Sequence, residues 1–199
     1  MNRTMTSLVA AIAVPAALAA PITIQNGGFE QAALGMDSFD TTAPIGWQAF
    51  GGNVGTFAPS MDNFGYSASE GNNLLYINSG GVQQTTSAVL EAETTYTLSV
   101  DVIARPGLHN GYLIELLAGD TVIAFDDGSQ NPDDGQFLTS ILTYTAPADG
   151  SLLGEAITVR LTGAFQTNLD NVSLDATLVP APAASALFGL AALGFRRRR

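Results

Sequence analysis

The sequence predicts an all-β protein, an antiparallel jelly-roll β-sandwich, and three observations support this fold class. Short segments with alternating apolar and polar residues recur through the body of the chain. Clusters of Gly, Asn, Asp and Ser separate these segments at short intervals. No long helical period occurs outside the two ends of the chain. Short strands with frequent turns and no helices are typical of sandwiches and barrels.

The predicted strands can be placed by their alternation. Residues 94–102, TTYTLSVDV, carry an apolar residue at every second position, and residues 156–163 repeat this pattern. Residues 111–125 are predicted to form two strands joined by a tight turn at Ala118-Gly119-Asp120. Residues 137–147 and 169–178 are further strands, and the last of these ends the domain.

The first 19 residues have the features of a secretory signal peptide. Arg3 precedes an apolar stretch that ends in the A-x-A sequence Ala17-Leu18-Ala19. We expect an N-terminal apolar helix here, with cleavage after Ala19. The sandwich domain is expected over residues 20–178.

The last 21 residues, 179–199, form a separate tail. Residues 183–195 are an uncharged apolar run that would reach only ~20 Å as a helix, whereas a bilayer core is ~30 Å thick. Four arginines follow, and such blocks stay on the cytoplasmic side of a membrane. The tail is therefore expected to be a short apolar helix that acts as a transient inner-membrane anchor.

This tail resembles the C-terminal signal of PEP-CTERM sorting proteins. The matching residues are Val179, Pro180, Ala181 and Pro182, then the apolar run, then Arg196, Arg197, Arg198 and Arg199. The family usually has Glu where this chain has Ala181. The resemblance implies recognition by an exosortase after export by the secretion machinery. It also implies a Gram-negative bacterium that makes extracellular polysaccharide, with the mature protein at the cell surface or in the matrix.

The body of the chain is strongly acidic. Residues 22–178 contain all 18 acidic residues and only two arginines, a formal net charge of −16. Such a charge disfavours nucleic acids and anionic membranes. The chain has no Cys, so disulfides cannot stabilise it, and a hydrophobic core or a metal must do so.

The body also resembles a known fold family. The segments ITIQNGGFE (22–30), GWQAF (46–50) and LDNVSL (169–174) are similar in order to galactose-binding-like jelly rolls, the fold of many carbohydrate-binding modules. This resemblance implies a domain that binds carbohydrate, although the fold hosts many functions. Phe64 and Tyr66 lie in an Asn- and Gly-rich loop and are the candidate rings for sugar stacking. Trp47 is a third candidate, although a Trp after a Gly at a strand start is more often core.

Catalytic motifs are weak in this sequence. His109 is the single His, and without a second His or a Cys the sequence offers no catalytic nucleophile that it could activate. No G-x-S-x-G, HExxH or P-loop sequence occurs. The sequence therefore predicts that the protein is not an enzyme.

One structural Ca²⁺ is predicted at the ends of the domain. Asp170 lies two and four residues before Val172 and Leu174 in the last strand, so its side chain is expected to point to the same, apolar side. A carboxylate buried there needs hydrogen bonds or a cation. Many galactose-binding-like jelly rolls carry Ca²⁺ between their first and last strands. By that resemblance Glu30 and Asp170 supply the carboxylates, with carbonyls near Gly27-Gly28. The alternative is that Asp170 accepts backbone amides without a metal.

Together these features predict an exported, PEP-CTERM-sorted surface protein whose jelly roll binds exopolysaccharide. One alternative is a purely structural biofilm component that binds other proteins. Another is a secreted enzyme similar to a glycoside hydrolase, with paired carboxylates.

Overall fold

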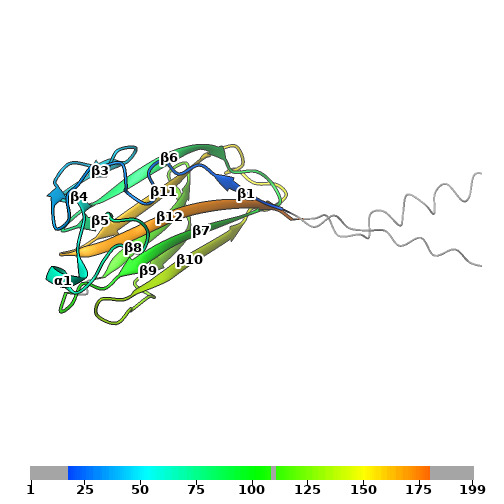
Figure 1. Ribbon diagram of the computed structural model, residues 1–199. Helices are drawn as coiled ribbons and strands as arrows, with labels where there is room; N and C mark the ends of the chain where they lie inside the picture. The colour runs from blue at the N-terminus through cyan, green and yellow to red at the C-terminus, as the bar shows by residue number, and fades with distance from the viewer. Residues whose placement is uncertain (1–17, 109–110, 180–199) are drawn as a thin grey trace, which may run out of the picture.

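The computed structural model describes residues 18–108 and 111–179, which form a two-layer β-sandwich (Figure 1). Every pair of neighbouring strands is antiparallel. The all-β jelly-roll sandwich expected from the alternating pattern is therefore confirmed. Within the described ranges, no helix is long and apolar enough to cross a membrane. The predicted signal peptide helix and the tail beyond Val179 lie outside the described residues.

The described residues contain twelve strands and one short helix. In chain order they are β1 (Ala19–Ile22), β2 (Phe39–Asp40), β3 (Gln48–Phe50), β4 (Val54–Phe57), α1 (Met61–Phe64), β5 (Leu74–Ile77), β6 (Gly81–Val89), β7 (Thr94–Ile103), β8 (Tyr112–Ala118), β9 (Thr121–Asp127), β10 (Phe137–Thr145), β11 (Ala156–Gly163) and β12 (Thr167–Leu178).

The strands form two sheets. The large sheet has the order β10-β7-β12-β5-β4-β2, with β1 paired to β12, and the small sheet has the order β3-β6-β11-β8-β9. The predicted hairpin turn is present, because Ala118 pairs with Thr121 and Gly119 adopts a φ of +57° that suits glycine. Figure 1 shows β12 running the length of the domain, with α1 at the end opposite β1.

The hydrophobic core lies between the two sheets. The alternating residues of β7 and β11 that the sequence assigns to the interior, such as Leu98 and Val159, are fully buried there. Trp47 is also part of this core, with its ring centroid 5.6 Å from that of Phe29. The Trp47 Nε1–H donates a hydrogen bond to the Asn26 carbonyl at 3.2 Å.

The outer face of the large sheet, which points away from the small sheet, is also covered. On β5, Leu75 and Ile77 face the main core, whereas Leu74 and Tyr76 belong to a second apolar cluster. That cluster includes Tyr66, which follows α1, so the segment between β4 and β5 packs on this outer face. An unbroken apolar strand such as β5 is expected where both faces are buried.

A β-bulge in β12 changes the side on which Asp170 lies. Leu169, Val172 and Leu174 all reach the main core, so the alternation reverses between residues 169 and 172. Asn171 adopts a φ of +50° at this position, and the pairing with β7 shifts register between Asp170 and Ser173. The parity argument for Asp170 was therefore wrong: its side chain points to the outer face, where it is nonetheless completely buried.

Candidate functional site

A cavity of about 320 Å³ lies on the outer face of the large sheet. This volume is at the lower end of the range for small-molecule sites. The residues that line it are Asp37, Phe39, Thr41, Asn53, Phe57, Phe64, Tyr76, Asn78, Arg105 and Gln166. They come from widely separated segments and combine four aromatic rings with one carboxylate and one guanidinium.

The second apolar cluster supplies three of the four aromatic rings of the cavity wall, and Phe39 supplies the fourth. The rings of Phe57 and Phe64 meet edge to face with centroids 4.9 Å apart, and Phe39 contacts Tyr76 in the same way at 6.4 Å. Gly55, opposite Tyr76 on β4, allows this wall to close. A Cβ at Gly55 would lie 1.8 Å from the Asp40 carbonyl oxygen and 2.8 Å from the Tyr76 hydroxyl.

The short helix α1 places Phe64 at the cavity. Ser60 caps its N-terminus by accepting a hydrogen bond from the Asn63 N–H at 3.3 Å, and Gly65 ends it with a φ of +73°. Asp37 holds the same turn, because its carboxylate accepts hydrogen bonds from the Ser60 N–H and the Asn63 side chain. These bonds from Asn63 and Ser60 lower the pKa of Asp37, so this carboxylate is ionised at neutral pH.

Arg105 is the cationic group of the cavity. Its Nη1 donates a hydrogen bond to Gln166 Oε1, and its guanidinium carbon lies 5.4 Å from the centroid of the Phe64 ring. Gln166 is fixed in turn, because its backbone N–H and its Nε2 both donate to Asn78 Oδ1, at 3.2 and 2.9 Å. Half-buried side chains from three separate segments thus hold the guanidinium at the cavity wall.

Two buried polar groups lie next to this site. The Tyr66 hydroxyl and Asn168 Oδ1 have no hydrogen-bond partner among the described residues, although both side chains are almost completely inaccessible. Burial raises the pKa of Tyr66 to about 12, against the opposing effects of the nearby Arg105 charge and the Asn168 side chain. Asn168 pairs with Tyr76 across β12 and β5, which places it beside the cavity wall.

A second hollow of about 470 Å³ lies along β9 and β10, the adjacent edge strands of the two sheets. Its lining includes Phe125 and Ile141, both largely exposed, and Asp126 as the charged group. We take the smaller cavity as the candidate site because it brings opposite charges and four aromatic rings together.

The structure separates the three rings predicted to stack on sugars. Trp47 is a core residue, and Tyr66 is completely buried, so neither ring offers a surface to a sugar. Phe64 alone of the three lines the cavity. His109 lies outside the described residues, as do the tail residues after Val179.

Glu30 and Asp170 do converge on one loop, residues 69–73. The Asp170 carboxylate accepts hydrogen bonds from the Ser69 N–H, the Ser69 hydroxyl and the Glu70 N–H at 2.9–3.1 Å, and from the Asn171 N–H at 2.7 Å. Glu30 Oε1 accepts the N–H groups of residues 72 and 73 at 2.8 and 2.6 Å.

These contacts bear on the predicted Ca²⁺. Both oxygens of Asp170 accept N–H groups, and the Gly27 carbonyl accepts the Val172 N–H at 3.0 Å. Asp170 thus has the amide partners that the metal-free alternative requires. The part of the chain that the structure describes holds no group of three or more His, Cys, Asp and Glu placed to bind a metal. The Ca²⁺ site stays a prediction.

Comparison with known proteins gives the family. Residues 20–175 match the HpiC1-like family, described as HpiC1 cyclase, so this chain belongs to the HpiC1-like cyclases. Among curated proteins, none matches the chain.

Solved structures of cyclases are similar over the same region. The apo form of a cyclase from Fischerella sp. is 30% identical, with a TM-score of 0.75, over 82% of this chain and 98% of that one. The Stig cyclase Fisc from Fischerella sp. TAU, in complex with (3Z)-3-(1-methyl-2-pyrrolidinylidene)-3H-indole, is 29% identical with a TM-score of 0.75, over 83% and 100%. A cyclase from the same source in complex with 4-(1H-indol-3-yl)butan-2-one is 28% identical with a TM-score of 0.73, over 81% and 100%.

These findings correct the functional expectations. The family is one of enzymes, so the prediction of a non-enzymatic carbohydrate-binding surface protein was wrong. Two of the solved cyclases hold small indole compounds, which overturns the expectation of exopolysaccharide, exosortase and membrane partners. The predicted signal peptide, the resemblance of the tail to a PEP-CTERM signal and the extracellular location are untested and stay predictions.

Most residues of the cavity carry no motif that marks them in the sequence. Phe57, Tyr76 and Arg105 were assigned no role, and Gln166 and Asn78 lie in turns that carry no motif. Two signals were available: the unbroken apolar run of residues 74–77, which indicates a strand buried on both faces, and Arg105 as one of only two arginines in the body.

Proposed function

We propose that this protein is a small-molecule cyclase that closes a ring within an aromatic substrate bound in the cavity beside Tyr76. The family match over residues 20–175 carries this proposal. The cavity supports it, because about 320 Å³ lined by four aromatic rings suits a flat, mostly apolar molecule. By analogy with the solved cyclases, we propose an indole or a similar ring system as the substrate's aromatic part.

Ring closure needs two atoms of one flexible molecule to be held together. A cavity with aromatic walls favours folded conformations of the substrate, in which the two reacting atoms lie close together. The rings of Phe57 and Tyr76 also stabilise positive charge that develops as bonds rearrange.

The polar groups have complementary roles in this proposal. Asp37 is ionised because its pKa is lowered, so it stabilises developing positive charge and does not donate a proton at neutral pH. Burial and the nearby Asp40 charge raise the pKa of Tyr76, so its hydroxyl stays protonated, and it donates to the Asp40 carbonyl at 3.2 Å. This bond uses the single O–H of Tyr76, so the Tyr76 oxygen can only accept from a substrate, whereas Arg105 supplies cationic N–H donors at the cavity wall.

Binding of 4-(1H-indol-3-yl)butan-2-one, measured by isothermal titration calorimetry, tests the site. The wild type is expected to bind this neutral indole, and Thr41→Trp, which adds a bulky side chain to the cavity lining, is expected to abolish binding. Thr121→Trp places the same side chain on the exposed start of β9 and is the matched control. Equal binding by both variants, with unchanged melting temperatures, would place the ligand elsewhere and reject the cavity as the site.

A further inference from the structure

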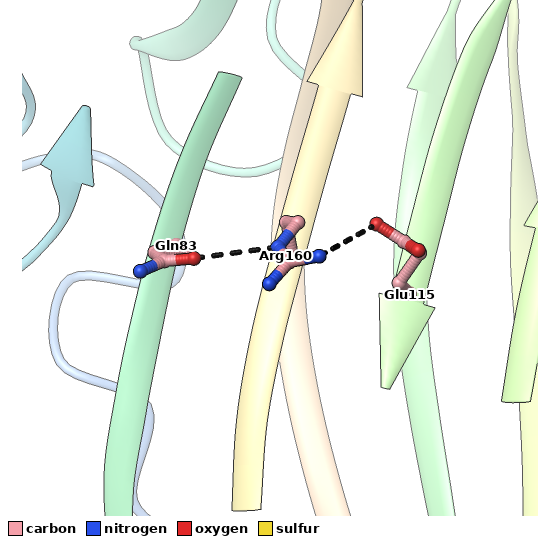
Figure 2. Close-up of polar contacts among 3 residues, drawn as sticks. All are labelled: Gln83, Glu115 and Arg160. Carbon is pink, nitrogen blue, oxygen red and sulfur yellow. Dashed lines mark hydrogen bonds and ion pairs between the residues drawn. The ribbon is translucent and has the colours of Figure 1, made fainter. Parts of the chain in front are cut away.

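The two arginines of the sandwich have different surroundings. Arg160 lies on the outer face of the small sheet, between its neighbours on β6 and β8 (Figure 2). Its Nη1 is 3.6 Å from Glu115 Oε2, and its Nε donates to Gln83 Oε1 at 3.3 Å. The charge of Arg160 is thus balanced by a carboxylate within the protein.

Arg105 has different polar contacts. Among the described residues it forms no ion pair, and one hydrogen bond, to the neutral Gln166 Oε1, is its single polar contact. A guanidinium has five N–H donors, so most of its donors remain available at the cavity wall. In a domain with a formal net charge of −16, acidic side chains are abundant, yet no described carboxylate, Asp37 of the same cavity included, forms an ion pair with this half-buried cation.

The position of Arg105 is also fixed before any ligand binds. Asn78 holds Gln166 through two hydrogen bonds, Gln166 holds one edge of the guanidinium, and the Phe64 ring supports it. A cation held in this way loses little side-chain entropy on binding an anion. This arrangement suits a planar carboxylate, which an arginine can bind through two parallel N–H···O bonds.

We propose that Arg105 binds a carboxylate group of the substrate, so that the cavity selects an aromatic carboxylic acid over its neutral counterpart. The ionised Asp37, which lines the same cavity, repels a carboxylate and therefore orients the acid toward Arg105. This inference rests on the proposed function, because it assigns the substrate class of the same cavity.

Two probes of nearly equal shape test the inference. Indole-3-propionate has a carboxylate where 4-(1H-indol-3-yl)butan-2-one has an acetyl group. Calorimetric titration of the wild type at low salt is expected to give about tenfold tighter binding of the acid. Arg105→Gln is expected to remove this preference, because it lowers the affinity for the acid more than the affinity for the ketone. Arg160→Gln removes the same charge on the opposite sheet and is expected to preserve the preference.

The outcomes separate the two proposals. Equal affinity of the wild type for acid and ketone, or an acid preference that survives in Arg105→Gln, overturns the carboxylate inference and leaves the cavity site standing. Failure of both probes to bind overturns the site itself. If Arg105→Gln does not fold, Arg105→Lys provides a second test, since Lys keeps the charge without the planar fork and is expected to reduce the acid preference. The acid preference of the wild type is also expected to be lost at high salt.

Discussion

The guanidinium carbon of Arg105 lies 5.4 Å from the centroid of the Phe64 ring, and this contact joins the end of α1 to the loop after β7. Phe64 is the one residue predicted as a ligand platform that lines the cavity, and its ring supports the charged group of the site. The contact therefore joins Phe64, which stabilises the cavity wall, to Arg105, which is the cationic group available to a ligand.

Replacing Phe64 with Leu keeps an apolar side chain but removes the aromatic face beneath Arg105. Loss of a half-buried cation–π contact and of the edge contact with Phe57 is expected to lower the free energy of unfolding by about 1–2 kcal/mol. Chemical denaturation measures this change. Phe125→Leu, at a ring that is 66% exposed, is the control and is expected to stay within about 0.5 kcal/mol of the wild type. Equal effects of the two substitutions would show that the Phe64 contacts contribute nothing specific.

Gly55→Ala is expected to disrupt the opposite wall. The added Cβ would lie 1.8 Å from the Asp40 carbonyl oxygen, so β2 must move away from β4 and Tyr76. We expect the free energy of unfolding to fall by about 1–3 kcal/mol, and the binding free energy of the indole ketone to weaken by at least as much. Gly128→Ala is a contrast with nothing within 4 Å of its Cβ, although its φ of +71° carries its own strain. Unchanged ligand binding in Gly55→Ala would argue that the cavity wall does not contact the ligand.

Asp170 is expected to make stability depend on pH. Burial raises its pKa from 3.8 to about 7, although the amides of Glu70 and Asn171 and the side chain of Ser69 oppose this rise. Between these two pH values the folded protein keeps a proton that the unfolded chain releases, so stability falls as the pH rises from about 4 to 7 and is constant above that. The total change is at most about 4 kcal/mol.

Unfolding free energies of wild type and Asp170→Asn in EDTA measure this effect. The unfolding free energy of the wild type is expected to exceed that of Asp170→Asn by more at pH 4.5 than at pH 7.5. The reason is that the wild-type carboxyl group loses its proton over this range, whereas the amide of the variant does not titrate. Asp149→Asn, at an exposed turn, is the control for the general effect of removing one carboxylate. An advantage that grows with pH would mean that the amide and hydroxyl donors outweigh burial and keep Asp170 ionised.

The predicted Ca²⁺ has a separate test. If Glu30 and Asp170 bind Ca²⁺ in the folded state only, a free concentration about 100 times the Kd adds about 2.7 kcal/mol. This raises the melting temperature by about 5–10 °C relative to EDTA. Mg²⁺ is the control ion, and Glu30→Gln is expected to weaken the response. A melting temperature that is the same in Ca²⁺ and EDTA would reject the site and leave Asp170 with its amide partners alone.

The sequence predicted the fold better than the site, and particular residues show why. Alternation in residues 94–102 and 156–163 reports the core directly, because burial on one face of a strand imposes a period of two. The bulge at Asn171 has no such signature, so the side on which Asp170 lies could not be read from parity. Tyr66 was assigned to an exposed loop because nothing in the local sequence shows that this loop folds over the large sheet.

The cavity could not be predicted from the sequence for a different reason. Its residues extend from Asp37 to Gln166, and each segment alone resembles an ordinary strand or turn. The motifs NGGFE and LDNV indicated the jelly roll correctly, but this fold hosts both carbohydrate-binding modules and cyclases. A fold resemblance therefore gave the architecture without the chemistry.

Product analysis tests the central claim most directly. The protein is incubated with an apolar extract of the cells that produce it, and the compounds are compared by liquid chromatography and mass spectrometry. Ring closure without loss of a group keeps the mass, so we expect one compound to decrease while an isomer of equal mass and different retention time increases. Thr41→Trp, which adds a bulky side chain to the cavity lining, is expected to leave the extract unchanged. No isomer with the wild type, or equal formation of it by Thr41→Trp, would contradict a cyclase that acts in this cavity.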